Sequence, residues 1–123
     1  MFILANMNTN QFTELNHLTF NVGKMALKQE QKITMNSQVY LLNENILETI
    51  LQVNKHLSVA QVSNQNEIPK EILYAYVKCN RLMSFIIKAY QKSEISREDF
   101  LHFEIEIKLL MNRLETACEN YSR

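Results

Sequence analysis

Residues 96–121 read SREDFLHFEIEIKLLMNRLETACENY, and this stretch decides the fold. Its apolar side chains recur at alternating steps of three and four residues: Phe100, Phe103, Ile107, Leu110, Leu114, Ala117 and Tyr121. That spacing puts them on one face of an α-helix, so the stretch predicts a helix over 96–121 with one buried face. Ser96 and Asp99 stand three residues apart, as in a capping box with Asp in place of Glu, and mark the start of this helix.

Three earlier segments have a similar periodicity. Pro69 fits the first turn of a helix over 69–91, because that turn leaves amide hydrogens without helical partners. We predict that the buried face of this helix is formed by Leu73, Tyr76, Asn80, Met83, Ile87 and Tyr90, widened by Ile72, Val77 and Ile86. Apolar positions at helical spacing also predict helices over 10–28 and 35–58. The predicted buried face of the first is formed by Phe12, Leu15, Leu18, Val22, Met25 and Ala26, and that of the second by Val39, Leu42, Ile46, Ile50, Val53 and Leu57.

Turn residues are scarce, with one Gly and one Pro in 123 residues. Sheets need many turns, so this scarcity favours a few long helices joined by short loops. The predicted loops are 29–34, 59–67 and 92–95, and short loops make consecutive helices antiparallel neighbours. We therefore predict an all-α protein, in which residues 1–123 form a single antiparallel up-down-up-down four-helix bundle. The alternative is three long helices preceded by a disordered N-terminal arm.

The formal net charge is zero, from 13 basic and 13 acidic side chains. A dedicated nucleic-acid-binding protein normally carries a basic excess, so this neutrality argues against that class. The two cysteines, Cys79 and Cys118, lack metal-type spacing and are interpreted as reduced thiols. The apolar run at residues 2–5 is too short for a signal peptide or a membrane span. We therefore expect a cytoplasmic protein that does not enter a membrane.

The chain contains no glycine-rich phosphate loop, nucleophile elbow or paired-cysteine zinc pattern, so we expect no enzymatic activity and no cofactor. Two weaker patterns involve histidine. Glu14 and His17 have the Glu-x-x-His spacing of di-metal bundles, but they fall on a polar face whereas such ligands point inward, so we expect no metal. Arg97 and His102 have the Arg-x4-His spacing of ribonucleases of the HEPN helical family. The alternative is a solvated first turn of the last helix.

Charge is segregated between the last two predicted helices. Residues 69–92 carry five basic side chains and one acidic, a net charge of +4, whereas residues 94–121 carry seven acidic and three basic, a net charge of −4. One face of the helix over 69–91 carries the candidate binding residues, named here the basic stripe: Lys78, Arg81, Phe85, Lys88 and Lys92. Their candidate acidic counterparts on the last helix are Glu104, Glu115 and Glu119.

Three interpretations of this segregation are open. In the first, the two helices pair their charges within one chain, which contributes little because exposed pairs add at most about 1 kcal/mol. In the second, the basic stripe contacts a protein partner or the acidic helix of a second copy. Such a contact joins two different faces, so it is heterologous and forms a ring if it closes. In the third, the stripe contacts the phosphates of a nucleic acid.

Two segments resemble a known family. KITMNSQVYLLNENILETILQ (32–52) is similar to the start of the second helix in the accessory variability proteins of diversity-generating retroelements. The segment LYAYVKCNRLMSFIIKAYQKSEISREDFLHFEIEIKLLMNRLETACENY (73–121) is similar in length, hydrophobic spacing and turn position, and its SEISREDF resembles the polar turn before the last helix of that family. The wider four-helix family includes proteins encoded in ribosomal-RNA intervening sequences. Its members tend to be strongly basic, whereas this chain is neutral.

The resemblance implies a homo-oligomeric helical bundle that binds a reverse transcriptase and its nucleic acid. The residues themselves predict a non-enzymatic binding or scaffolding module that associates with itself or with another protein. One alternative is a small regulatory protein, such as an inhibitor or antitoxin-like partner of a larger enzyme. The other is a HEPN-like ribonuclease that uses Arg97 and His102.

Overall fold

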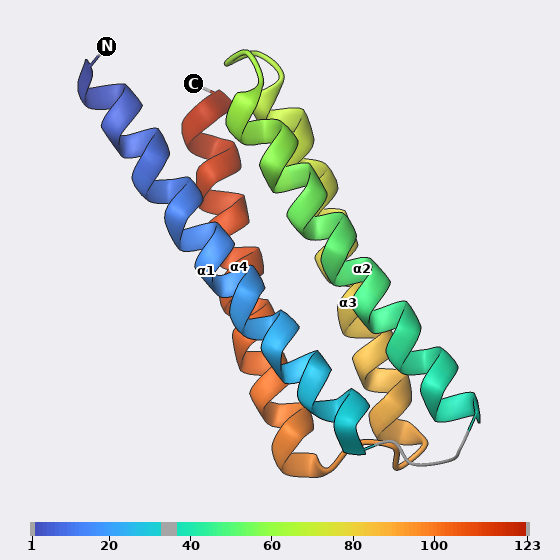
Figure 1. The fold of residues 1–123 in the computed structure, drawn as a ribbon. Coiled ribbons are helices and arrows are strands. Elements are labelled where there is room, and N and C mark those ends of the chain that lie inside the picture. Colours follow the sequence, from blue (N-terminus) through green and yellow to red (C-terminus); the bar gives the residue numbers. More distant parts are fainter. Residues whose placement is uncertain (1, 33–36, 123) are drawn as a thin grey trace.

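The computed structural model describes the backbone of residues 2–32 and 37–122, and the side chains of 11–29 and 44–121. Four helices follow one another: α1 (Phe2–Lys32), α2 (Ser37–Val62), α3 (Ile68–Gln91) and α4 (Arg97–Ser122). Their directions alternate along the chain, so that each helix runs antiparallel to the next (Figure 1). The predicted all-α bundle is therefore confirmed.

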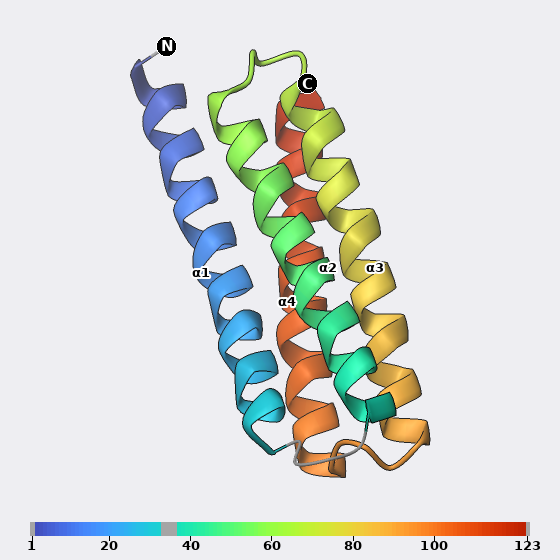
Figure 2. The same ribbon diagram turned by 45° about the vertical axis from the view of Figure 1, so that its right-hand side comes forward.

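Each helix packs against two neighbours, α1 against α2 and α4, and α3 against α2 and α4. In the described part of the chain, the diagonal pairs α1/α3 and α2/α4 have no Cα atoms within 8 Å of each other. Figure 2 shows the same square arrangement from a second direction. Among the described residues, no helix is long and apolar enough to cross a membrane.

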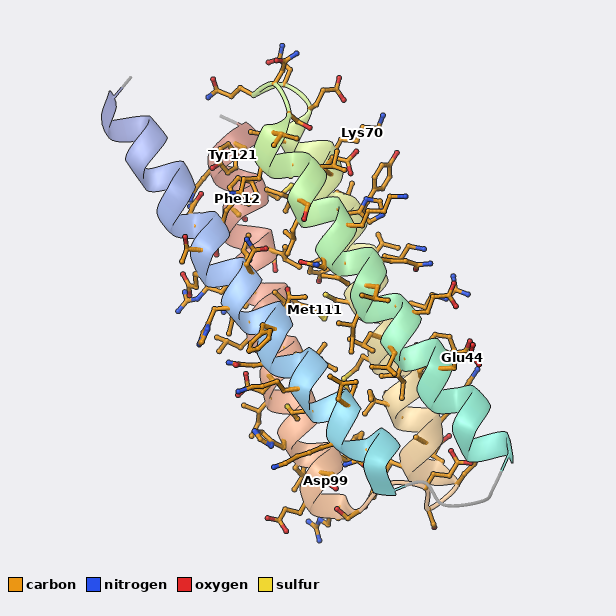
Figure 3. The ribbon with its side chains drawn as sticks, viewed as in Figure 1. Phe12, Glu44, Lys70, Asp99, Met111 and Tyr121 are labelled. Carbon is orange, nitrogen blue, oxygen red and sulfur yellow. The ribbon has the colours of Figure 1, made fainter. Side chains whose placement is uncertain are left out.

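The centre of the square is filled by apolar side chains from all four helices. Phe12 of α1 and Tyr121 of α4 point toward one another near one end, with ring centroids 6.2 Å apart (Figure 3). The predicted buried face of α4 is confirmed from Phe103 to Tyr121, while Phe100 is half-buried against the core. The predicted faces of α1 and α2 are also buried where their side chains are described, apart from the half-buried Met25.

The predicted buried face of α3 is confirmed at Ile72 and Ile86 but is otherwise wrong in register. The side chains that α3 buries are Ile68, Ile72, Ala75, Cys79, Leu82, Ile86 and Ala89. Leu73 and Val77, which the pattern placed in the core, are 52% and 53% exposed. The cause is size, because small side chains at 75, 79 and 89 let α3 approach its neighbours closely. The larger apolar side chains of the predicted face then lie on its flank or outside.

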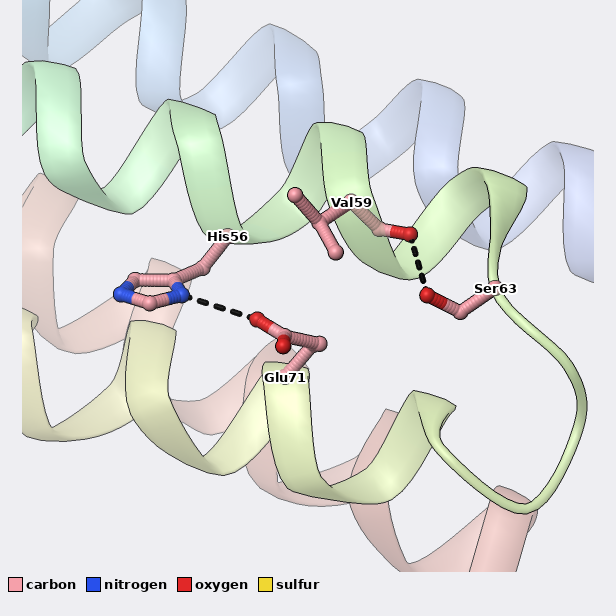
Figure 4. A network of polar contacts seen from close by, with 4 residues as sticks. All are labelled: His56, Val59, Ser63 and Glu71. Atoms are coloured by element: carbon pink, nitrogen blue, oxygen red, sulfur yellow. Dashed lines mark hydrogen bonds and ion pairs between the residues drawn. The ribbon is translucent and has the colours of Figure 1, made fainter.

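The helix ends also differ from the predicted ones. The first helix begins at Phe2 rather than near residue 10, so the alternative with a disordered N-terminal arm is wrong. The second helix continues to Val62, which shortens the predicted loop over 59–67 to residues 63–67. The hydroxyl of Ser63 donates to the carbonyl oxygen of Val59 at 2.6 Å and closes this last turn (Figure 4). The predicted loop over 29–34 is helical to Lys32, and its last two residues lie outside the described part.

Candidate binding surface on α3

The two flanks of α3 can be assigned from contacts with its neighbours. Glu71, Lys78, Phe85 and Lys92 stand seven residues apart and so lie in one line along the helix. Oε2 of Glu71 lies 2.9 Å from Nδ1 of His56 on α2, so this line borders α2 (Figure 4). The stripe predicted from the sequence therefore lies on the α2 side of α3.

A second line runs beside the first, through Tyr74, Arg81 and Lys88. The ring of Tyr74 packs on that of His56 with centroids 5.4 Å apart, which places this line next to the first. Together with Lys70, the two lines form a band from residue 70 to residue 92, about 33 Å long at 1.5 Å per residue. Figure 3 shows Lys70 pointing away from the bundle at one end of this band.

Aromatic side chains alternate with basic ones in the band. Nζ of Lys70 lies 5.9 Å from the ring centroid of Tyr74, and Cζ of Arg81 lies 5.7 Å from that of Phe85. Both are i, i+4 pairs in which a cation lies over an aromatic face. The prediction missed Lys70 and Tyr74, although their spacing repeats that of Arg81 and Phe85.

The bases of the basic stripe form no ion pair with any side chain that the structure describes. Arg81, Lys88 and Lys92 are exposed and Lys78 is half-buried. Glu71 lies in the same line, but its carboxylate contacts His56 instead. The structure therefore does not support the interpretation in which α3 and α4 pair their charges.

The acidic counterparts lie on a different face of the bundle. Glu104 precedes Cys118 by two heptads, and Sγ of Cys118 lies 3.8 Å from the carbonyl oxygen of Pro69, so Glu104 borders α3 from the α4 side. Its carboxylate also pairs with Lys108 at 3.7 Å. Glu115 and Glu119 are exposed further along α4.

The α4 flank of α3 is opposite to the basic stripe. The ring of Tyr90 stacks on that of Phe100 on α4 at 4.4 Å between centroids. Tyr76 and Met83 continue the line of Tyr90 at heptad spacing, whereas the stripe follows the line of Glu71 on the α2 side. The structure therefore does not bring the predicted basic and acidic residues together within one chain.

The histidines of the two sequence patterns, His17 and His102, lie on the outer surface of the bundle. His102 is 60% exposed and its Nε2 lies 4.0 Å from Oε1 of Glu106. Arg97 is exposed one turn earlier, and a separation of five residues points the two side chains about 140° apart around α4. Glu14 forms an ion pair of 2.8 Å with Nε of Arg113. No group of three or more His, Cys, Asp or Glu side chains in the described part of the chain could hold a metal.

The predicted cap of α4 is confirmed, because the amide of Asp99 donates to Oγ of Ser96 at 3.1 Å. The carboxylate of Asp99 has a further role that the sequence did not indicate. Its Oδ2 accepts a hydrogen bond of 2.7 Å from Nε2 of Gln29, which ties the start of α4 to α1.

A groove between α1 and α2 was not predicted. Its volume is about 460 Å³, and it is lined chiefly by Phe20, Gly23, Leu27, Leu47, Ile50 and Leu51. Phe20, Leu27 and Leu51 are 63%, 51% and 67% exposed. The heptad spacing of Phe20 and Leu27 was a signal for a second apolar line on this helix, outside its core face.

Three surface features are therefore available for binding: the basic stripe, the acidic side chains of α4 and the apolar groove between α1 and α2. Each is formed by side chains that rigid helices hold in place. Comparisons of the chain with protein-family models, with curated proteins and with solved structures give no significant match.

Proposed function

We propose that this chain is a non-enzymatic binding module that associates with further copies of itself. In this proposal the basic stripe of one copy contacts the acidic side chains Glu104, Glu115 and Glu119 of another. The observation that supports it is the placement of the two charged sets on different faces, with the bases of the stripe unpaired among the described side chains.

The placement also indicates the kind of assembly. A contact between two different faces is heterologous, so each copy can bind one neighbour through its basic stripe and a second neighbour through its acidic side chains. If the rotation closes, the product is a ring. Phe85 lies half-buried between the bases of the stripe and provides an apolar contact at the centre of the charged surface. Salt screens exposed charges beyond about 10 Å at 0.1 M, so the assembly should weaken as salt rises.

The test is the solution mass, measured by light scattering at low and at high salt. The wild-type chain should exceed its monomer mass of 14.5 kDa at low salt. Reversing two charges of the stripe, Lys88→Glu with Lys92→Glu, should lower the mass. A control with the same change in net charge, Lys55→Glu with Arg97→Glu, should leave it unchanged. An equal mass for wild type and stripe variant would defeat the proposal.

A charge swap makes the test specific for the two surfaces. Glu115→Lys with Glu119→Lys should by itself lower the mass, because the neighbour's stripe then meets like charges. Combining these substitutions with Lys88→Glu and Lys92→Glu restores opposite charges and should restore the assembly. Restoration would be hard to obtain from a variant that had merely lost its fold.

A second candidate function is contact with single-stranded nucleic acid, as an accessory protein of a reverse transcriptase. The alternation of Lys70, Tyr74, Arg81 and Phe85 along α3 favours it, because aromatic rings stack on bases while cations meet phosphates. The resemblance of residues 32–52 and 73–121 to retroelement accessory proteins points the same way.

Fluorescence anisotropy with a labelled single-stranded RNA tests this candidate. Tyr74→Ala should weaken binding by about 1–3 kcal/mol if a base stacks there, whereas Leu73→Ala, one residue away on the other flank, should not. The logarithm of the binding constant should fall linearly with the logarithm of salt concentration. No binding at 50 mM salt would remove this candidate and leave the self-association test unaffected.

The proposal places the protein in the cytoplasm. Cys79 is a free thiol and is fully buried. A free thiol of this kind suits a compartment in which thiols are kept reduced.

A further inference from the structure

A histidine of α2 lies at one end of the basic stripe. Glu71 precedes Lys78 by one heptad, so it stands about 10 Å before the first base of the stripe. Its Oε2 lies 2.9 Å from Nδ1 of His56, and the two side chains are 23% and 19% exposed. The imidazole of His56 is therefore partly open to solvent at the edge of the surface that is proposed to bind an acidic partner.

The contact with Glu71 assigns the roles of the two ring nitrogens of His56. An ionised carboxylate only accepts hydrogen bonds, so Nδ1 is the nitrogen that carries the hydrogen. Figure 4 shows the other nitrogen, Nε2, on the side of the ring away from Glu71. Among the described side chains, no hydrogen bond or ion pair involves this Nε2. A proton added to the ring therefore goes to an atom that faces away from the existing contact.

Helix α3 also holds the ring through an aromatic contact. The ring of Tyr74 lies 5.4 Å from that of His56, with an angle of 53° between the two planes. Nζ of Lys70 lies 5.9 Å from the centroid of the same tyrosine ring. The imidazole is thus placed beside the cation–aromatic pair that begins the band along α3.

The charges around His56 balance. On α3 they are the carboxylates of Glu67 and Glu71, which stand one turn apart, and the ammonium group of Lys70. On α2 the exposed Lys55 is its neighbour in the sequence. The contacts of the ring are with α3, whereas α1 packs on another side of α2. These four charges sum to zero, so the protonation state of the ring decides whether this end of the surface is neutral or positive.

We propose that His56 is a pH-dependent member of the basic stripe, which tightens the contact with the acidic side chains of a second copy when its ring is protonated. This inference rests on the proposed self-association and assigns its regulation. Histidine is the side chain whose charge ordinarily changes between pH 8 and pH 5. Nδ1 donates in both states of the ring, so protonation adds a positive charge to the surface and leaves the hydrogen bond to Glu71 in place.

Coulomb's law gives the size of the effect. Two opposite unit charges about 8 Å apart in water attract each other enough to change an equilibrium constant about two- to threefold. The dissociation constant of the assembly should therefore be about two- to threefold lower at pH 5.5 than at pH 7.5. Glutamate side chains ordinarily titrate near pH 4.3, below this range, so the acidic partner keeps its charge. The difference should shrink as salt rises.

Dilution series followed by light scattering at pH 7.5 and pH 5.5, both at low salt, measure the dissociation constant. His56→Gln keeps an amide that can donate to Glu71 but gains no charge, so its constant should be the same at both pH values. His56→Lys is positive at both, and at pH 7.5 it should associate about as tightly as the wild type does at pH 5.5. Circular dichroism and thermal unfolding verify that each variant is folded.

The other two histidines provide the control. His17 is exposed on α1, and His102 lies on α4 beside Lys28 of α1, so neither borders the basic stripe. His17→Gln with His102→Gln removes two titrating rings and should leave the pH dependence of the wild type unchanged.

The outcomes distinguish this inference from the proposed function. A wild-type assembly with equal dissociation constants at the two pH values overturns the role of His56, and so does a pH dependence that survives His56→Gln or disappears with His17→Gln and His102→Gln. In each of these cases the self-association stands if Lys88→Glu with Lys92→Glu still disrupts it. A wild-type mass of 14.5 kDa at every pH and salt concentration overturns both.

Discussion

Nδ1 of His56 on α2 lies 2.9 Å from Oε2 of Glu71 on α3, and the two side chains are 23% and 19% exposed. This contact links α2 to α3. It also engages the carboxylate of Glu71, which lies in the same line along α3 as three residues of the basic stripe. We predict a coupling of about 0.5–1.5 kcal/mol between these side chains, measured as a double-mutant cycle of His56→Ala and Glu71→Ala by urea unfolding.

An exposed pair in α4 provides the control for that cycle. His102 and Glu106 have the same residue types, but they are 4.0 Å apart, His102 is 60% exposed, and both belong to one helix. Their coupling should not exceed about 0.5 kcal/mol. Equal coupling energies in the two cycles would show that the contact between His56 and Glu71 contributes no more than a surface pair.

The register of α3 gives a prediction with a neighbouring control. Ile72 is fully buried whereas Leu73 is 52% exposed. Ile72→Ala should lower the free energy of unfolding by about 2–5 kcal/mol through lost burial and a residual cavity. Leu73→Ala should cost less than about 1 kcal/mol. Chemical denaturation of both variants measures the difference, and a larger loss for Leu73→Ala would restore the register predicted from the sequence.

The fold itself was predictable from the sequence. Helical periodicity, the capping residue Ser96 and the scarcity of Gly and Pro all indicate long helices with short turns, and the structure has them. The register of α3 was not predictable by the same reasoning, because the pattern was built on large apolar residues. The buried face of α3 includes Ala75, Cys79 and Ala89, and these small side chains let α3 pack closely on its neighbours.

The candidate surface was predictable in part. Helical spacing groups Lys78, Arg81, Phe85, Lys88 and Lys92 on one side of α3, and the contacts of Glu71 and Tyr74 with His56 place that side next to α2. Spacing within one helix does not tell which neighbouring helix that side borders. This depends on packing contacts such as those of Glu71 with His56 and of Tyr90 with Phe100. The groove was missed because Phe20, Leu27 and Leu51 come together only when α1 and α2 are paired.

Burial of Cys79 predicts a dependence of stability on pH. Desolvation raises the pKa of its thiol from 9.0 to about 12, so the folded state holds this proton more tightly than the unfolded state does. The resulting stability is complete below pH 9 and is lost as pH rises toward 12. Above pH 9 the wild-type chain should lose about 1.4 kcal/mol per pH unit more than Cys79→Ala, measured by urea unfolding from pH 8 to 11.

The reactivity of the two thiols tests the same burial without unfolding the protein. At pH 8 the half-buried Cys118 should react with a disulfide reagent well before Cys79 does. Cys118→Ser should then remove the fast phase and leave the slow one. Equal rates for both thiols would contradict the packing of Cys79 in the core.

Gly23 offers a stabilising substitution, because a Cβ atom placed on it would lie 3.8 Å from Cγ2 of Ile50, an ordinary van der Waals distance. Glycine within a helix costs about 1 kcal/mol relative to alanine. Gly23→Ala should therefore raise the free energy of unfolding by about 0.5–1 kcal/mol. The slope of that free energy against urea concentration should not change. Ala26→Gly, one turn later at a fully buried site, should lower it by at least that amount. A lower stability of Gly23→Ala would contradict this packing. It would mean that the added Cβ atom meets Cγ2 of Ile50 at less than 3.8 Å, so that α1 and α2 lie closer together there.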